Sequence, residues 1–390
     1  MSKPRLLVLA STFPARPGDG TPGFVRDLAR VEATAFDTVV LVPRVPGAAR
    51  REVVDGLRIE RFGYFPRRWE DLADGAIVEN VRGKRSRLLQ VPFFLLFEVL
   101  AVRKWVRSHR PDVLHVHWVI PQGIVALLAA RGVPRLVTTL GGDVYALTDP
   151  VSLRLKRAVL TRAGAVTTMN LDMRDRLLAL GAPPDRTLVL PMGADVQGVR
   201  AGGVGIRRVP GRLLFVGRLV EKKGLAVLLE AVRNLPDGWS LDVAGGGPLL
   251  ESLQAQAAGL PVTFLGQTTK DDLARAYAAC EVLVVPSVPA ASGDQDGLPV
   301  ALLEAMAAGC AVVASRIAGI DEAVVDGESG VLVTPGSEAE LTGALNRMLS
   351  DPGLRQQLGR GAAARAESYS MSALGQRYVT LLQEVLRRAP

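Results

Sequence analysis

Residues 213–224 read LLFVGRLVEKKG. The four apolar residues at the start predict a buried strand, and an apolar helical pattern begins directly afterwards at Leu225. The loop between them contains Arg218 and Lys223, so it would place backbone N–H groups and two cations at the start of a helix. Such a loop is a ready binding site for a diphosphate, although the same residues also fit a solvated basic turn.

Similar apolar runs recur along the chain, and each is followed by a helical pattern. Strands that are apolar throughout and alternate with helices indicate parallel sheets covered on both faces. The pattern occurs twice, which predicts an α/β fold of two doubly wound domains with ligands bound at the carboxyl ends of strands, in a shared cleft. The predicted strands are Leu6–Leu9, Val39–Val42, Val113–Val116, Leu136–Thr139, Ala165–Thr168, Thr187–Leu190, Leu213–Val216, Leu241–Ala244, Val262–Leu265, Val282–Val285, Ala311–Ala314 and Val331–Val333.

The two halves are separated by residues 197–210, QGVRAGGVGIRRVP, which are rich in glycine and lack periodicity. This composition predicts a linker. We therefore expect a first domain at residues 1–196 and a second at 211–370. An amphipathic helix is expected at 371–390, packing back toward the first domain.

The cysteines and the hydropathy pattern indicate the cellular compartment that we expect for the protein. Cys280 and Cys310 lie in apolar surroundings and form no CxxC pair, which argues against a disulfide scaffold or a zinc site and fits a reducing cytoplasm. The apolar run Leu6–Ala10 is too short for a signal-peptide core. Because no run of about 18 uncharged apolar residues occurs, no membrane span is predicted.

Positive charge is concentrated in residues 82–110, which contain eight Lys or Arg and one Glu. The same stretch contains VPFFLLF at residues 91–97. Two interpretations stay open, namely a core-facing helix with a solvated basic back and a peripheral helix on an anionic membrane surface. Nucleic acid fits less well, because no polar base-reading side chains are interleaved with the apolar ones.

A second glycine-containing loop follows the predicted strand Leu241–Ala244 in the sequence LDVAGGGP. Gly245 and Gly247 would let a phosphate or ribose approach the backbone closely. The loop is not a dinucleotide fingerprint, because Leu250 stands where GxGxxG needs a glycine. A plain tight turn is the alternative.

The third motif is DQDGLPVALLEAMAAG at residues 294–309. Pro299 suits the first turn of a helix and Gly309 suits its carboxyl end, so Asp296 precedes the helix and Glu304 lies within it. Glu304 interrupts an otherwise apolar helix, where a charge is costly unless it is paired or faces a ligand. This favours a carboxylate that binds a polyol.

In the first half, HVHW at residues 115–118 ends a predicted strand. Side chains two residues apart share one face of a strand, but the last residue can project beyond its end. We expect His117 to reach the ligand site and His115 to be a satisfied core residue. A third ligand with suitable spacing for a metal is missing.

Together these motifs resemble those of the retaining glycosyltransferase family 4, which has the GT-B fold. VGRLVEKKG, AGGGP, VLVVPS and DGLPVALLEAMAAG resemble its donor-domain motifs, and HVHW and LPMGAD resemble motifs of its first domain. The likeness covers nearly the whole chain. Its common order and spacing make it far more specific than any single motif.

The resemblance implies roles for residues of the second half. Arg218 and Lys223 would hold the donor diphosphate, and Glu304 would bind the ribose of the nucleotide. Asp296 stands where the family usually has the first glutamate of a Glu-x7-Glu pair, beside the amides of Gly297 and Leu298, and would contact the donor sugar. The loops with Gly217, Gly245 and Gly247 would complete the donor site.

In the first half, Gly23 resembles the residue of a loop whose amides approach the phosphates. His117 matches a histidine near the primary hydroxyl of the sugar. Leu140 in TTLGGDV occupies a position where the family has a histidine, so no catalytic role passes to it.

The implied reaction is metal-independent transfer of a sugar from a nucleotide diphosphate donor, without a cofactor and with front-face attack on the sugar. The donor sugar, the base and the acceptor stay unidentified, and candidate acceptors are a lipid-linked glycan, a cell-surface polysaccharide or a small molecule. Three alternatives stay open: a nucleotide-sugar epimerase, a metal-dependent transferase using Asp294 and Asp296, and a non-catalytic scaffold at a membrane surface.

Overall fold

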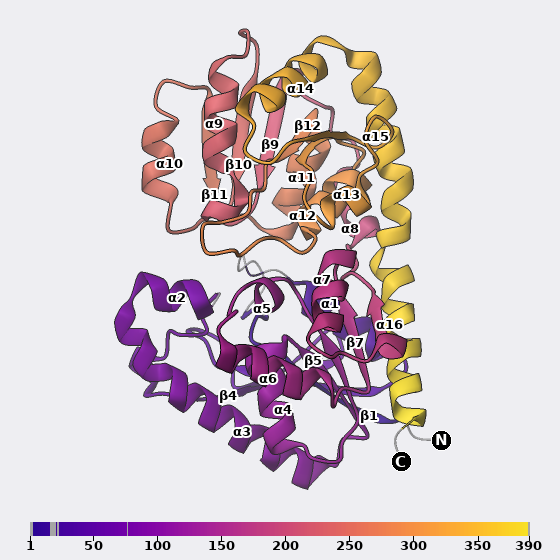
Figure 1. Ribbon diagram of the computed structural model, residues 1–390. Coiled ribbons are helices and arrows are strands. Elements are labelled where there is room, and N and C mark those ends of the chain that lie inside the picture. Colours follow the sequence, from indigo (N-terminus) through magenta and orange to yellow (C-terminus); the bar gives the residue numbers. More distant parts are fainter. Residues whose placement is uncertain (1–2, 16–20, 22, 76, 389–390) are drawn as a thin grey trace. The chain divides into compact units, whose positions relative to one another are not determined.

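The computed structural model describes the chain except for residues 1–2, 16–20, 22, 76 and 389–390. The described residues form two compact units (Figure 1). The first contains the residues up to Met192 and those from Leu374 onward, and the second contains Gly193–Ala373. The chain therefore leaves the first unit once and returns to it. Within the described residues, no helix is long and apolar enough to cross a lipid bilayer.

Among the described residues, the first unit is built on an eight-stranded sheet with the order β3-β4-β2-β1-β5-β6-β7-β8. Neighbouring strands are parallel except for β3 and β4, which form an antiparallel hairpin. The strands are β1 (Arg5–Leu9), β2 (Asp37–Pro43), β3 (Arg51–Val54), β4 (Leu57–Phe62), β5 (Val113–His117), β6 (Arg135–Thr138), β7 (Ala165–Thr168) and β8 (Thr187–Val189). The helices and short turns are α1 (Phe24–Glu32), η1 (Arg67–Trp69), α2 (Ile77–Gly83), η2 (Arg85–Leu89), α3 (Gln90–His109), η3 (Val119–Gly123), α4 (Ile124–Ala129), α5 (Gly142–Tyr145), α6 (Pro150–Leu160), α7 (Leu171–Ala179) and η4 (Pro184–Arg186).

The second unit, which is described throughout, is built on a six-stranded parallel sheet with the order β11-β10-β9-β12-β13-β14. Its strands are β9 (Arg212–Val216), β10 (Ser240–Ala244), β11 (Val262–Gly266), β12 (Val282–Val285), β13 (Ala311–Ser315) and β14 (Val331–Val333). Its helices and turns are α8 (Val196–Gly202), η5 (Glu221–Lys223), α9 (Leu225–Arg233), α10 (Leu250–Gln256), α11 (Lys270–Ala279), α12 (Val300–Ala307), α13 (Ile320–Ala323), α14 (Glu338–Ser350), α15 (Pro352–Ala366) and η6 (Glu367–Tyr369). Helix α16 (Met371–Arg387) starts at its end.

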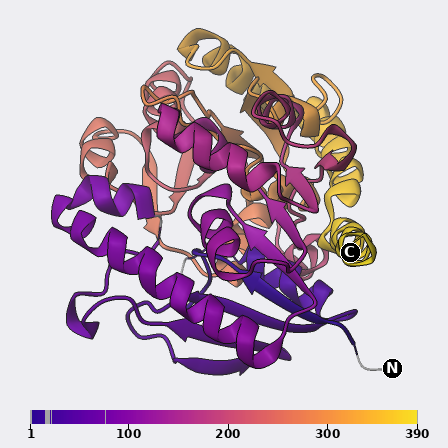
Figure 2. The ribbon, with the colours of Figure 1, turned by 60° about the horizontal axis from the view of Figure 1, so that its bottom comes forward.

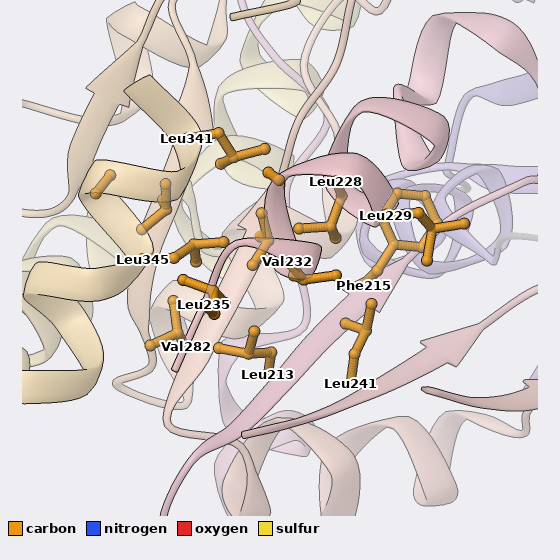
Figure 3. Packing of buried hydrophobic residues seen from close by; sticks show 14 of the residues in the cluster. Leu213, Phe215, Leu228, Leu229, Val232, Leu235, Leu241, Val282, Leu341 and Leu345 are labelled. Carbon is orange, nitrogen blue, oxygen red and sulfur yellow. The ribbon is translucent and has the colours of Figure 1, made fainter. Parts of the chain in front are cut away.

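Side chains of β9 point alternately to two apolar cores, so both faces of the second sheet are covered. Leu213 and Phe215 pack with residues of α9 and α14, whereas Leu214 packs against α8, α11 and α12. Figure 3 shows Leu228 and Leu229 of α9 next to the strand residues on the first of these faces. The predicted doubly wound arrangement of parallel strands and helices is confirmed.

The predicted linker is the main difference in organisation. Val196–Gly202 form helix α8, whose amino end is capped by Asp195 accepting from the Gly198 N–H at 2.9 Å. Val196 and Val199 are buried in the second unit, so the stretch is part of that unit's core. The chain passes between the units earlier than expected, at Met192.

The last helix, α16, packs on the first unit through its residues from Leu374 onward. The Tyr378 hydroxyl donates to the Leu190 carbonyl at 2.6 Å, and both residues are buried. A Cβ atom at Gly375 would lie 2.9 Å from the Val31 side chain, so the helix approaches α1 closely there. The carboxyl end of the chain therefore completes the core of the first unit.

Helix α3 is the long helix that packs beside α4 (Figure 2). Its buried face carries Gln90, Phe94, Glu98, Val102 and Trp105. The large apolar residues around them are half-exposed or exposed. The core-facing interpretation of residues 82–110 therefore fails for most of its apolar residues, because the helix turns them outward.

Glu98 is buried and pairs with buried Gln122 of η3, whose Nε2 donates to Glu98 Oε1 at 3.2 Å. Burial raises the pKa of Glu98 to about 8, although the bond from Gln122 lowers it. The second oxygens of both side chains, Glu98 Oε2 and Gln122 Oε1, have no other partner among the described residues. A protonated Glu98 can donate to Gln122 and satisfy both atoms at once.

This pair predicts a loss of stability as the pH rises. The folded chain keeps the proton of Glu98 up to about pH 8, whereas the unfolded chain releases it near pH ~4.3, so the free energy of unfolding falls between these values. Glu98→Gln removes the titration and keeps an amide pair. From about pH 5 to pH 8.5, the wild type should lose on the order of 3 kcal/mol more than the variant in urea unfolding. Glu384→Gln on α16 is the control, and parallel curves for wild type and Glu98→Gln would refute the pair.

Candidate active site

The candidate site of the second unit lies where the direction of strand order reverses. Strand β9 is flanked by β10, which follows it, and by β12, so the carboxyl ends of β9 and β12 form the switch point of the sheet. Ligands of open α/β sheets bind at this position. The loop after β9 begins at Gly217, and the loop after β12 leads to Pro299.

Lys223 and Asp296 come from these two loops and form an ion pair. Lys223 Nζ lies 2.8 Å from Asp296 Oδ2, and the Ser287 hydroxyl donates to the same oxygen at 3.0 Å. Asp296 is buried, which by itself would raise its pKa, but the charges of Lys223 and Lys222 and the bonds from Lys223 and Ser287 together hold the pKa below its usual value. Asp296 is thus an anion that holds the Lys223 ammonium at the switch point.

Lys222 has a different partner. Its Nζ lies 3.0 Å from Asp294 Oδ2 and 4.0 Å from Asp296 Oδ1. Both aspartates therefore face lysines. In the part of the chain that the structure describes, no group of three or more His, Cys, Asp or Glu side chains is placed to hold a metal ion.

The glycines of the β9 and β10 loops let these loops pack against each other. Gly217 N–H donates to the Ala244 carbonyl at 2.9 Å, and Leu219 N–H donates to the Gly246 carbonyl at 3.0 Å. A Cβ atom at Gly245, whose φ is +133°, would lie 2.0 Å from the Gly217 carbonyl oxygen. At Gly247 it would lie 2.5 Å from the Leu219 carbonyl oxygen. Gly245 and Gly247 are therefore needed for the packing of the two loops, whether or not they also bind a ligand.

A further glycine joins the loops after β9 and β12. Gly224 has φ +67°, and a Cβ atom there would lie 1.7 Å from the Pro286 carbonyl oxygen. The Val288 N–H donates to the Lys222 carbonyl at 2.9 Å. This close approach aligns the cationic loop with the loop of Asp296. Gly224 ends the motif LLFVGRLVEKKG, but the motif alone gave no sign of this contact with Pro286.

Glu304 is half-buried on α12 and accepts a hydrogen bond from Tyr277 of α11, with 3.0 Å between the Tyr277 hydroxyl and Glu304 Oε2. Burial raises the pKa of Tyr277 well above its usual value, and the nearby Glu304 raises it further. The phenol therefore stays a donor and orients the carboxylate. Tyr277 is a site residue that sequence reasoning missed, since its spacing from Glu304 carries no signal.

Three other predicted residues belong to the same loops as Lys223 and Asp296. Arg218 follows Gly217 directly and is half-buried. Gly297 is buried and Leu298 half-buried, and both stand between Asp296 and the start of α12. The second unit thus brings the predicted donor-side residues to the carboxyl ends of β9, β10 and β12.

In the first unit, His115 and His117 end strand β5. His115 is a satisfied core residue, as predicted, since it bonds to Glu32 at 2.5 Å and to Thr138 at 2.7 Å. His117 is also buried, but neither ring nitrogen has a hydrogen-bond partner among the described residues. Burial lowers its pKa well below the usual value, so the imidazole is neutral and has one donor and one acceptor unused. Buried polar atoms of this kind call for a bound ligand or water.

The turn after His117 is strained and held from a second loop. Trp118 has φ +72°, a conformation that non-glycine residues rarely adopt. Buried Asp143 accepts from the Val119 N–H at 2.9 Å and from the Leu140 N–H at 3.0 Å. Asp143 therefore fixes the backbone on which His117 stands, a positioning role that the sequence analysis did not assign.

Gly23 lies in the same unit, just before α1. A Cβ atom there would lie 2.9 Å from the Arg26 guanidinium. Most of the preceding segment, residues 16–20 and 22, lies outside the described residues. The structure therefore places Gly23 at a helix start but adds no contact to its predicted role.

The fold and these loops define a two-unit α/β protein with a candidate ligand site at the strand switch point of its second unit. Sequence comparison assigns it to a family. Residues 210–351 match the model described as glycosyl transferases group 1, and residues 19–193 match a glycosyl transferase 4-like domain. The D-inositol 3-phosphate glycosyltransferase of Acidothermus cellulolyticus is 32% identical over 365 residues, which cover 82% of this chain and 79% of that protein. The chain belongs to the group 1 glycosyltransferases.

Other relatives and solved structures agree. The GDP-mannose-dependent alpha-(1-6)-phosphatidylinositol monomannoside mannosyltransferase of Mycolicibacterium smegmatis is 30% identical, over 68% of this chain and 73% of that protein. Sucrose-phosphate synthase from Thermosynechococcus elongatus has a TM-score of 0.80 at 22% identity, covering 99% of this chain and 100% of that one. Anabaena HepE, solved with UDP-glucose, has a TM-score of 0.70 at 18% identity, covering 97% and 99%. The fold is GT-B.

Proposed function

We propose that this glycosyltransferase moves a sugar from a nucleotide diphosphate donor to an acceptor with retention of anomeric configuration. The observation that supports it best is the Lys223–Asp296 pair at the switch point, 2.8 Å apart. A cation held there by a single carboxylate can exchange part of that contact for a diphosphate. The relative whose name specifies GDP-mannose, and the HepE structure with UDP-glucose, point to a nucleotide diphosphate sugar as donor.

Breaking the anomeric C–O bond places growing negative charge on the leaving diphosphate. Arg218 and Lys223 would stabilise that charge as preorganised cations. Gly217, Gly245 and Gly247 belong to loops that would lie beside the donor, and the resemblance assigns Gly23 to its phosphates. This arrangement needs no cofactor.

The remaining residues would orient the donor. Glu304, aligned by Tyr277, would accept hydrogen bonds from the ribose hydroxyls. Asp296, Gly297 and Leu298 would contact the sugar. The resemblance also assigns His117 to the primary hydroxyl of the sugar, but the imidazole is fully buried in the first unit. Because no side chain is assigned as a nucleophile, retention would follow from front-face attack, with the departing phosphate accepting the proton of the acceptor.

Metal independence is part of the proposal. Asp294 and Asp296 are engaged by Lys222 and Lys223, so the two carboxylates do not stand as an open cation site. The two cations Arg218 and Lys223 would neutralise the diphosphate in place of a metal ion.

The experiment is titration calorimetry with a panel of UDP- and GDP-sugars in the presence of EDTA, followed by transfer assays with the donor that binds. We expect one donor class to bind without metal and the new linkage, read from its anomeric NMR coupling, to keep the donor's configuration. Metal-dependent binding, epimerised donor without transfer, or an inverted product would each overturn the corresponding part of the proposal.

Replacing Glu304 with alanine should weaken donor binding. The ribose hydroxyls would lose a charged acceptor, worth about 1.5–3 kcal/mol, or about 10- to 150-fold in Kd by calorimetry. Tyr277→Phe should cost less, since it removes only the group that aligns Glu304. Glu230→Ala, a partly exposed carboxylate on α9, is the matched control. Donor affinity that is unchanged in folded Glu304→Ala would remove Glu304 from the site.

A further inference from the structure

The outer side of α3 presents an uninterrupted row of large apolar side chains. Phe93, Phe97 and Leu100 follow one another at helical spacing, and their exposed fractions are 46%, 42% and 47%. The row begins in η2 and includes further exposed residues, namely Leu88, Leu89 and Leu96. Soluble proteins rarely leave so many neighbouring large apolar side chains in water unless the patch binds something.

The orientation of α3 is held from its inner side. Gln90 Nε2 donates to the Trp69 carbonyl at 2.8 Å, and Glu98 is tied to Gln122. These hydrogen bonds hold the side chains of Gln90 and Glu98 on the buried face of the helix. They therefore keep the apolar row facing outward.

An exposed tryptophan stands at the amino end of this row. Trp69 of η1 is 54% exposed and bonds through its carbonyl to the first residue of α3. The Arg68 guanidinium lies over its ring, 4.0 Å from the centroid. Tryptophan with an adjacent cation is typical of side chains at the headgroup level of a membrane.

Cations continue the same line toward the carboxyl end of α3. Arg103, Lys104 and Arg107 are exposed and follow Leu100 by three, four and seven residues. Together with Leu100 and Ser108 they line a shallow hollow of about 510 Å³. Residues 85–109, all described, contain one acid, and this acid is the buried Glu98. The exposed charge of the helix is therefore entirely positive.

We infer that this α3 surface, made of Trp69, Leu88, Leu89, Phe93, Leu96, Phe97, Leu100, Arg103, Lys104 and Arg107, docks on a membrane that contains anionic phospholipids. The apolar row would enter the region between headgroups and acyl chains, and the cations would contact lipid phosphates. A second copy of the chain fits less well, because a two-fold contact would bring like charges together. The inference uses none of the proposed donor-site residues, so it goes beyond the proposed function.

The test is cosedimentation of the full-length protein with phosphatidylcholine vesicles, with and without about 30% phosphatidylglycerol. We expect binding to the anionic vesicles at low salt and partial release at about 0.5 M NaCl, because salt screens exposed charges. Binding should shift the emission of Trp69 to shorter wavelength, read as the difference from Trp69→Phe.

Two variants separate the contributions. Phe93→Ser/Phe97→Ser/Leu100→Ser should lower vesicle affinity about tenfold or more, and Arg103→Glu/Lys104→Glu/Arg107→Glu should abolish the preference for anionic lipid. Leu155→Ser/Leu171→Ser, which changes exposed apolar residues on α6 and α7, is the matched control and should bind as the wild type does. Donor affinity should be unchanged in all three.

The inference is overturned if the wild type does not sediment with anionic vesicles at low salt, or if the serine variant binds as well as the wild type does. It is also overturned if the wild type is a dimer in sedimentation velocity that the serine variant converts to a monomer while vesicle binding is unaffected. A protein that binds vesicles but no nucleotide sugar would refute the proposed donor and leave this surface standing.

Discussion

Replacing Lys223 with glutamine is expected to lower kcat by about 10²- to 10³-fold, the scale for losing one preorganised partner of a charge that develops in the transition state. Lys223 Nζ lies 2.8 Å from Asp296, on the loop after β9, where the leaving diphosphate would bind. Glutamine keeps an N–H donor for Asp296 and removes the positive charge. Single-turnover kinetics with saturating donor would measure the loss in the chemical step.

Lys222 offers the matched control on the same turn. Its ammonium pairs with Asp294 at 3.0 Å, so Lys222→Gln should keep kcat within a few-fold of the wild type. Equal losses in both variants would mean that the turn as a whole, and not the Lys223 charge, is required. A normal kcat in Lys223→Gln would exclude Lys223 from leaving-group stabilisation.

Asp296→Ala should lose most of the activity, at least about 10²-fold in kcat/KM, and should also be less stable by about 1–3 kcal/mol, because the half-buried Lys223 and the Ser287 hydroxyl lose their acceptor. Asp296→Glu restores the residue that the family usually has and should keep measurable activity. Kinetics and urea unfolding of both variants check the two effects separately.

Asp294→Ala tests whether Asp296 acts by pairing with Lys223 or as one of two metal ligands. Asp294 contacts Lys222 and should tolerate the change with little loss of rate, whereas a cation bridged by both aspartates would be lost with either. Equal activity of Asp296→Ala and Asp296→Glu would count against the assignment of Asp296. Activity that EDTA abolishes and manganese restores would transfer the role of the cations to a metal.

Most of the fold follows from the sequence, because a strand covered on both faces must be apolar at every position. β12, VLVV, shows this directly. The β3–β4 hairpin at the edge of the sheet is not predicted, because it has no run that is apolar at every position. In β4, Arg58 and Glu60 alternate with apolar residues. Helix α8 is not predicted either, because a short helix with two buried valines and two glycines shows no helical period in the sequence.

The orientation of α3 could not be read from hydropathy. Large apolar side chains stand on both sides of the helix, and the polar bonds of Gln90 and Glu98 decide which side is buried. The same limit holds for the site. Its motifs indicate strand ends, but the pairing of Lys223 with Asp296 joins residues 73 positions apart and depends on the packing of two loops. Tyr277 acts through Glu304 and lies in no quoted motif, and Asp143 lies in TTLGGDV but acts through the backbone after His117.

The second unit begins and ends at one place. The Ala194 N–H donates to the Tyr369 carbonyl at 2.9 Å, and the Met371 N–H donates to the Ala194 carbonyl at 2.7 Å. A segment whose two ends are neighbours can be exchanged as a cassette between related genes without disturbing the host on either side. Recombination across residues 193–373 would replace Arg218, Lys223, Asp296 and Glu304 as one set. The α3 surface, Gly23 and His117 would stay behind with the first unit.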